Sequence, residues 1–230
     1  MGIRTRIREF LEYCELTNKS KKTIENYHHY LKRFEDFLGE DMSPKNLSIQ
    51  KVNNYRLYLS RLQPPLNIKT QNYHIIAVRA FLKYLTKNDI KTLAPEKIEL
   101  SKIPKRTVEF LTREELDRLF KSVDQTKKSG ARDLAILETL YSTGLRVSEL
   151  ASLNRDQVDL KRREFMVRGK GSKPRLVFLS EKASHIIKSY LKTRNDNFQP
   201  LFTNNQKTTD IANEEIRRLT TVSIENIVRK

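Results

Sequence analysis

The chain has 230 residues, of which 45 are Lys or Arg and 28 are Asp or Glu, so its formal net charge is +17. This length fits one large domain or two small ones, and this charge favours a polyanionic partner. No apolar run approaches the roughly 18 residues that a membrane-spanning helix needs. A single cysteine excludes an internal disulfide and indicates a reducing, cytoplasmic setting, while four scattered histidines offer no cluster that could bind a metal.

The first 90 residues have the apolar periodicity of amphipathic helices. Ile24, Leu31 and Leu38 belong to one such stripe, behind a possible N-cap at Ser20. The same spacing recurs at residues 52–62 behind Ser48 and again at residues 75–85. With an amphipathic segment at residues 7–16, the pattern predicts a four-helix domain over residues 1–90 whose apolar stripes form a core.

Residues 91–108 are predicted to be a linker. Pro95 and Pro104 bracket a stretch that has no consistent period, and positive charges gather near its end. We therefore expect a domain boundary here, with a second domain over residues 109–230.

The second domain mixes helices with one β-hairpin. Thr112 and Glu115 have the spacing of a capping box for a helix that continues to residue 123. Further helices are expected at residues 131–143, ended by Gly144, at residues 147–153, after Ser180, and near residues 224–228. Residues 165–168 and 175–179 read as strands joined by a glycine-containing turn. The predicted fold is mainly α with a small β-hairpin.

Arg146 occupies an unusual place for a cation. It lies two residues after Gly144, at the start of a predicted helix, where the helix dipole is positive. An arginine there indicates a bound anion, although a purely structural arginine is the alternative. Glu149 follows one turn later and could orient the guanidinium, or could equally form an ordinary surface salt bridge.

Lys170 is predicted at the tip of the hairpin, between Gly169 and Gly171. It follows Arg146 by 24 positions (170 − 146) and could meet the same anion or simply a backbone phosphate. The flanking run at residues 161–175 carries seven positive side chains against Glu164 alone. Such a run is typical of a phosphate-binding surface, the alternative being a solvated strand edge.

Two motifs resemble those of the tyrosine recombinases, the site-specific DNA recombinases and integrases of the Xer type in particular. Gly144-Leu-Arg146-Val-Ser-Glu149-Leu resembles their first arginine box, and Arg168-Gly-Lys170-Gly-Ser-Lys-Pro-Arg175 resembles their lysine hairpin. The resemblance implies an N-terminal core-binding (SAM-like) domain, a linker and an α+β catalytic domain. It also implies strand exchange through a 3′-phosphotyrosyl bond, without metal or cofactor. Arg146 would stabilise the transition state, Glu149 would support it, and Lys170 would protonate the leaving 5′ oxygen.

The implied partner is double-stranded DNA with paired half-sites, on which the family assembles as a tetramer. Basic and amide side chains in both domains and in the linker are the predicted DNA contacts: Lys21, Lys22, Lys69, Gln71, Asn72, Arg79, Lys102, Lys105, Arg106, Arg162, Arg163, Arg168, Lys173 and Arg175.

The resemblance is incomplete after the hairpin. The family has a His-x-x-Arg box and a nucleophilic tyrosine there, whereas this chain has only His185, followed by Ile-Ile-Lys188, and Tyr190, which has core-like neighbours. We therefore expect a catalytic domain truncated before both groups: a chain that is monomeric in solution and binds DNA but does not cleave it alone. The alternatives are a catalytically inactive regulator derived from a recombinase and a non-specific nucleic-acid-binding protein.

Overall fold

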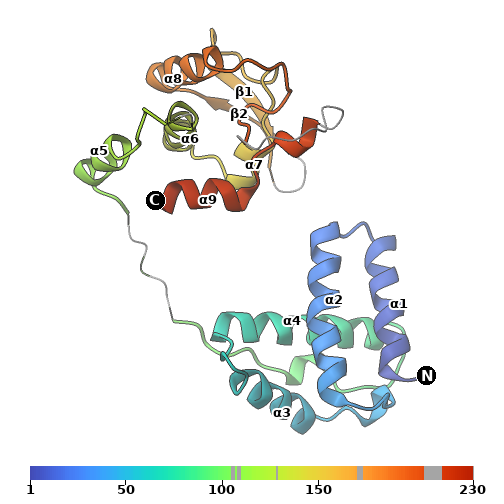
Figure 1. The fold of residues 1–230 in the computed structure, drawn as a ribbon. Helices are drawn as coiled ribbons and strands as arrows, with labels where there is room; N and C mark the ends of the chain where they lie inside the picture. The colour runs from blue at the N-terminus through green and yellow to red at the C-terminus, as the bar shows by residue number, and fades with distance from the viewer. Residues whose placement is uncertain (105–106, 108–109, 128, 170–172, 205–213, 230) are drawn as a thin grey trace. The chain divides into compact units, whose positions relative to one another are not determined.

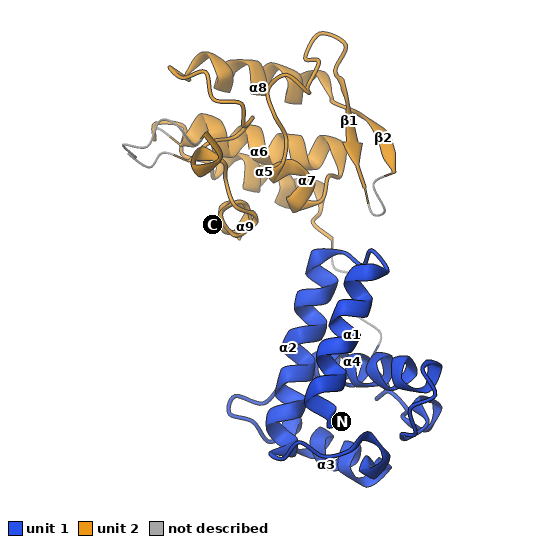
Figure 2. Cartoon of the chain, turned by 90° about the vertical axis from the view of Figure 1, so that its right-hand side faces the viewer, with its two compact units in different colours: residues 1–107 blue, residues 108–230 orange. Residues whose placement is uncertain are grey.

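The structure is a computed structural model that describes residues 1–104, 107, 110–127, 129–169, 173–204 and 214–229 (Figure 1). The chain divides into two units, residues 1–107 and residues 108–230, drawn in blue and orange in Figure 2. Each unit has its own hydrophobic core. Among the described residues, none of the helices combines the length and apolar composition needed to cross a lipid bilayer.

The described residues of the first unit form α-helices and 3-10 turns joined by loops, without a strand. Its elements are α1 (Ile3–Leu16), α2 (Lys21–Leu38), the 3-10 turn η1 (Pro44–Asn46), α3 (Ile49–Ser60), α4 (Ile68–Lys87) and the 3-10 turn η2 (Pro95–Lys97). Leu31, Phe34, Tyr55, Phe81 and Leu82 are fully buried where α2, α3 and α4 meet. The predicted four-helix domain is confirmed.

Side-chain caps set the starts of α2, α3 and α4. The Ser20 hydroxyl accepts from the backbone N–H of Thr23 at 3.2 Å, and Ser48 caps α3 in the same way. Asn67 caps α4, which therefore begins at Ile68, seven residues before Ile75, the first residue of the apolar stripe predicted for this helix.

The predicted linker begins as part of the first unit. Pro95 and Ile98 are buried, and Ile98 belongs to the helical core. The backbone of Ser101 is bonded to α4 through Asn72, by contacts of 2.8 and 3.1 Å. Residues 91–101 therefore pack on the helices instead of connecting freely.

The second unit combines helices with a two-stranded antiparallel sheet. Its elements are α5 (Arg113–Lys121), α6 (Gly130–Thr143), α7 (Val147–Ala151), β1 (Glu164–Arg168), β2 (Pro174–Phe178), α8 (Glu181–Lys192), the 3-10 turn η4 (Glu214–Arg217) and α9 (Thr221–Arg229). Helices α6 and α8 pack together, and Ile136, Leu150, Ile187 and Ile224 are buried in the core. The predicted capping box of Thr112 and Glu115 is present at α5.

The hairpin has one face toward this core. Phe165 pairs with Val177 and Val167 with Arg175 in the register, so these four alternate with outward-facing neighbours. Phe165, Val167 and Val177 are buried, whereas Met166 and Leu176 are exposed. The alternation places Arg175, a charged residue, on the inward face.

One ionisable group lies deep in the first unit. His74 of α4 is buried, and its Nδ1 is 2.9 Å from the hydroxyl of Tyr55. Burial, assisted by the positive charges of Arg33 and His29, lowers the pKa of His74 from 6.5 to about 4.

This lowered pKa predicts acid sensitivity. Between about pH 6.5 and pH 4 the unfolded chain binds a proton at His74 that the folded chain does not, so the free energy of unfolding falls as the pH falls, by about 3 kcal/mol across the window. Urea denaturation followed by circular dichroism should show that His74→Gln lacks this component, whereas a His185→Gln control, at an exposed position of α8, retains it. Equal pH dependence in wild type and His74→Gln would contradict the assignment.

Candidate functional site

Arg146 stands at the junction of α6 and α7. Helix α6 ends at Gly144, whose φ of +60° is the left-handed conformation that glycine adopts freely, and the Gly144 N–H bonds to the Leu140 carbonyl at 2.9 Å. Leu145 is then buried, and Arg146 is the extended residue immediately before α7. Its side chain is 65% exposed. The turn thus fixes the backbone of Arg146 while its guanidinium faces solvent.

Glu149 makes two contacts with Arg146. One carboxylate oxygen accepts the backbone N–H of Arg146 at 2.8 Å, and the other accepts from its Nη1 at 2.9 Å. The i, i+3 contact is therefore present. Because the Glu149 side chain is only 9% exposed, this is not an ordinary solvent-exposed salt bridge.

Arg175 of β2 is the third member of a charged cluster that also contains Arg146 and Glu149. Its Nη1 and Nη2 each donate to a different oxygen of Glu149, both at 2.8 Å, which is the bidentate geometry of arginine with a carboxylate. These bonds from Arg175, followed by those from Arg146, lower the pKa of Glu149 to about 2. The carboxylate is therefore ionised at any pH at which the protein would work, and it joins α7 to the hairpin.

The sequence identified Arg175 only as a DNA contact and missed this pairing. The available signal was strand alternation, because Arg175 shares its face with Val177, which predicts an inward position. A charged side chain takes an inward position only with a partner. The second arginine of the cluster could therefore have been anticipated, although its partner could not.

Lys170 lies outside the described residues, as do Lys105 and Arg106. Its expected place is bracketed by a bond from the Gly169 N–H to the Lys173 carbonyl at 3.0 Å, one step beyond the last strand pair.

Most of the other predicted DNA contacts are exposed. Lys21, Lys22, Lys69, Lys102, Arg162, Arg163, Arg168 and Lys173 all lie at the surface of their own unit. Some have acidic neighbours: Lys22 lies 3.4 Å from Glu25, and Arg162 lies 3.0 Å from Glu164. Gln71 and Arg79 are partly buried, and the Gln71 amide donates to the Leu66 carbonyl at 2.7 Å.

Asn72 is a correction to the predicted set. It is 5% exposed, and both ends of its amide are used by the backbone of Ser101. Its side chain bonds residue 101 of the predicted linker to α4, and it is too buried to contact DNA while that packing is intact.

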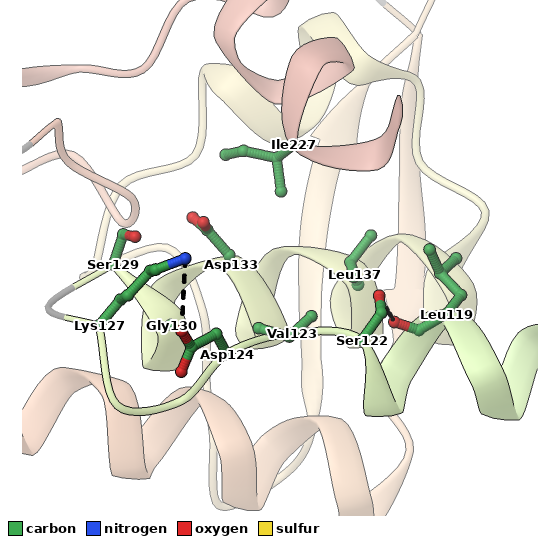
Figure 3. A pocket seen from close by; sticks show the side chains of 10 residues that line it. All are labelled: Leu119, Ser122, Val123, Asp124, Lys127, Ser129, Gly130, Asp133, Leu137 and Ile227. Atoms are coloured by element: carbon green, nitrogen blue, oxygen red, sulfur yellow. Dashed lines mark hydrogen bonds and ion pairs between the residues drawn. The ribbon is translucent and has the colours of Figure 1, made fainter. Parts of the chain in front are cut away.

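The described residues of the second unit line several cavities, and two of them are compared with the predicted site. A groove of about 810 Å³ opens beside the cluster, and Glu149, Arg162, Arg168 and Met166 are among its lining residues. A smaller cavity of about 190 Å³ lies among α5, α6 and α9, and its lining includes Leu119, Leu137 and Ile227 as well as the Asp124–Lys127 ion pair (Figure 3). Only the groove shares residues with the predicted site.

Tyr190 has the core position expected from its sequence neighbours. It is buried within the second core, and its hydroxyl lies 3.3 Å from both the hydroxyl and the backbone N–H of Thr203. A phenol in this setting is closed to a phosphodiester.

Family models match most of the chain. The phage integrase family matches residues 109–229, and the phage integrase N-terminal SAM-like domain matches residues 7–92. The tyrosine recombinase XerC of Bacillus subtilis is 32% identical over 203 residues, covering 84% of this chain and 64% of that protein. XerA of Thermococcus kodakarensis is 33% identical over 202 residues, covering 87% of this chain and 66% of that protein. The chain thus spans about two thirds of the length of these relatives.

Solved structures share the fold. A lambda integrase dimer bound to a COC′ core site has a TM-score of 0.73 at 13% identity, over 100% of this chain and 80% of that one. A Tn1549 transposon integrase in complex with transposon right end DNA has a TM-score of 0.73 at 15% identity, over 100% and 78%. At these identities the likeness concerns the fold alone.

Because Glu149 is shared by two arginines, we expect its substitution to lower the free energy of unfolding. Glu149→Gln removes the buried negative charge between two arginines, and because both arginines are partly exposed we expect a cost of about 1–2 kcal/mol. Since the pKa of Glu149 is about 2, far below its usual value of 4.5, its contribution is complete above pH 5 and is lost only toward pH 2. Thermal unfolding at pH 5 and pH 8 should therefore show the same destabilisation.

Glu181→Gln is the matched control, because Glu181 is 91% exposed and lies 3.8 Å from Arg163. It should change the free energy of unfolding by less than about 0.5 kcal/mol. Equal melting temperatures for Glu149→Gln and Glu181→Gln would contradict a stabilising role for the cluster.

Proposed function

Because the chain belongs to the phage integrase family, the tyrosine recombinases, we propose that it binds duplex DNA and presents the phosphate-binding part of an active site for strand cleavage and rejoining. The observation that supports this most is the asymmetry of the cluster. Its carboxylate is buried and doubly paired, while the guanidinium of Arg146 is mostly exposed at the start of a helix. Two arginines share one carboxylate, so the cluster retains an excess positive charge that suits an anion.

The chemistry expected of Arg146 follows from its donors. Glu149 accepts from Nη1, which leaves Nη2 and Nε to bind two non-bridging oxygens of a phosphodiester. The same contacts would stabilise the charge that develops in a five-coordinate transition state. In other phosphoryl-transfer systems a positioned arginine is worth about 10³ to 10⁵ in rate.

Lys170 is proposed as the proton donor to the leaving 5′ oxygen. This role rests on its motif and on general electrostatics, because a neighbouring phosphate raises a lysine pKa and favours a donor over a base. Glu149 has the supporting role of holding Arg146.

The rest of the predicted DNA contacts, apart from Asn72 and Arg175, are proposed to meet the DNA backbone. Lys21 and Lys22 begin α2 and Lys69 begins α4, so both helices carry positive side chains in their first turns. Lys105, Arg106, Lys102, Arg79, Gln71, Arg163 and Lys173 complete the proposed set, together with Arg162 and Arg168 at the groove. We propose paired half-sites as the target and a tetramer as the assembly on DNA, the chain being monomeric without it.

Cleavage by these 230 residues alone is not expected. Residues 171–230 contain no His-x-x-Arg sequence, and their one tyrosine, Tyr190, is buried. We therefore propose that this chain binds without cutting, and that strand exchange by the family route needs groups it does not supply.

The first test is binding. Selection from a random duplex library should enrich a sequence bound at least about 10³-fold more tightly than random DNA. If about ten basic side chains meet phosphates, affinity should fall by three to five decades between about 50 and 200 mM salt. Fluorescence anisotropy measures both quantities. Affinity that is independent of salt would remove the case for DNA binding, and binding without sequence preference would favour the non-specific alternative.

The second test is cleavage. A nicked suicide duplex that carries the selected site should give no covalent protein–DNA adduct with the 230-residue chain, as judged by denaturing electrophoresis. The matched reaction uses an active recombinase of the family on its own site, which must give the adduct. An adduct formed by this chain and abolished by Tyr190→Phe would show that the buried tyrosine does act and that the chain cleaves.

A further inference from the structure

The contacts of Glu149 are divided unequally between the two arginines. Arg175 uses two guanidinium nitrogens on the two carboxylate oxygens, whereas the side chain of Arg146 uses one nitrogen on one oxygen. The second oxygen accepts the Arg146 backbone N–H instead. One buried carboxylate thus fixes the backbone of Arg146 firmly and its side chain by a single bond.

We propose that Arg175 is a positioning residue for phosphate binding by Arg146, and that it acts by holding the Glu149 carboxylate in the orientation that leaves two nitrogens of Arg146 free. This inference rests on the proposed function. It assigns Arg175 to the site itself and not to the general DNA-contact surface.

Arg146 and Arg175 compete for one carboxylate. Arginine and carboxylate prefer a bidentate arrangement, and Arg146 and Glu149 are close enough in sequence to adopt it with each other. Were they to do so, two of the nitrogens of Arg146 would be withdrawn from a phosphate. Arg175 prevents this because its own planar guanidinium occupies that edge of the carboxylate.

A direct phosphate contact is the competing role for Arg175. Its side chain is 39% exposed, it lies on the inward face of β2, and two of its nitrogens already donate to Glu149. Exposed Arg168, one residue past the inward Val167, is far better placed for such a contact. The geometry therefore favours an action through Glu149.

Substitution of Arg175 by lysine distinguishes a positioning role from a direct phosphate contact. Arg175→Lys keeps the positive charge that a phosphate contact needs but lacks the planar pair of donors that holds the carboxylate. Arg118→Lys makes the same chemical change on α5 of the same unit, where the side chain is 76% exposed and lies outside the proposed DNA contacts, and is the matched control.

The experiment uses the full chain and the duplex selected by it, with one methylphosphonate placed at each backbone position in turn. The phosphate bound by Arg146 is the position at which the neutral methylphosphonate weakens DNA binding by the wild type by at least about 10-fold but does not weaken binding by Arg146→Ala. This loss of affinity is the methylphosphonate penalty. Arg175→Lys should reduce this penalty to within about threefold, while Arg118→Lys should retain it. A merely structural loss of stability would weaken all duplexes equally and leave the penalty intact.

A double-mutant cycle identifies the route of action. Glu149→Gln alone should also lose most of the penalty, and adding Arg175→Lys to it should change the penalty by less than about twofold, because the two residues act as one unit. If Arg175→Lys does not fold by circular dichroism, Glu149→Gln carries the test by itself.

Three results would overturn the proposal. The first is a full penalty in Arg175→Lys, or in Glu149→Gln if only that variant folds, and the second is additive losses in the double variant. The third is a second phosphate whose penalty disappears only in Arg175→Lys, which would mark a direct contact. In these cases the wild type still has a phosphate that depends on Arg146, so the proposed function stands. If no phosphate depends on Arg146 in the wild type, the proposed function and this inference fall together.

Discussion

One buried carboxylate organises the second unit around its site. Glu149 accepts the backbone N–H at the start of α7, one donor from Arg146 and two from Arg175. Helix α7 has only five residues, too few to be stable by itself, so its orientation depends on such contacts and on the burial of Leu150. The same carboxylate connects that helix to a strand 26 residues later, which is how a short helix and a two-stranded sheet come to share one charged cluster.

Much of the fold was predictable because its signals are local. Ser20, Ser48 and the Thr112–Glu115 capping box each satisfy N–H groups within the same first turn, and Gly144 ends α6 where only a left-handed residue fits. The apolar periodicity of α2 and α4 likewise depends only on residues within each helix. Such features can be predicted because they depend on residues that are close together in the sequence.

The parts that could not be predicted depend on distant partners. Asn72 looks like any polar residue at the start of a helix, and only the return of the chain at Ser101, 29 residues later, makes it a buried structural amide. Arg175 lies in a basic run that resembles a phosphate-binding surface, and its partner, Glu149, is supplied by α7, 26 residues earlier in the chain. In both cases the sequence shows a polar or charged residue, but the contact that decides its role lies across the fold.

The division of Glu149 between two arginines also constrains how this protein can evolve. A change at position 175 alters the hydrogen bonding of Glu149, and through it the freedom of Arg146, so neither position can drift alone. Homologous sequences that lack an arginine at the position of Arg175 are expected to carry a compensating change near the carboxylate. The charged residues of the hairpin strand and of the short helix are therefore expected to change together, although they lie 26 positions apart in the sequence.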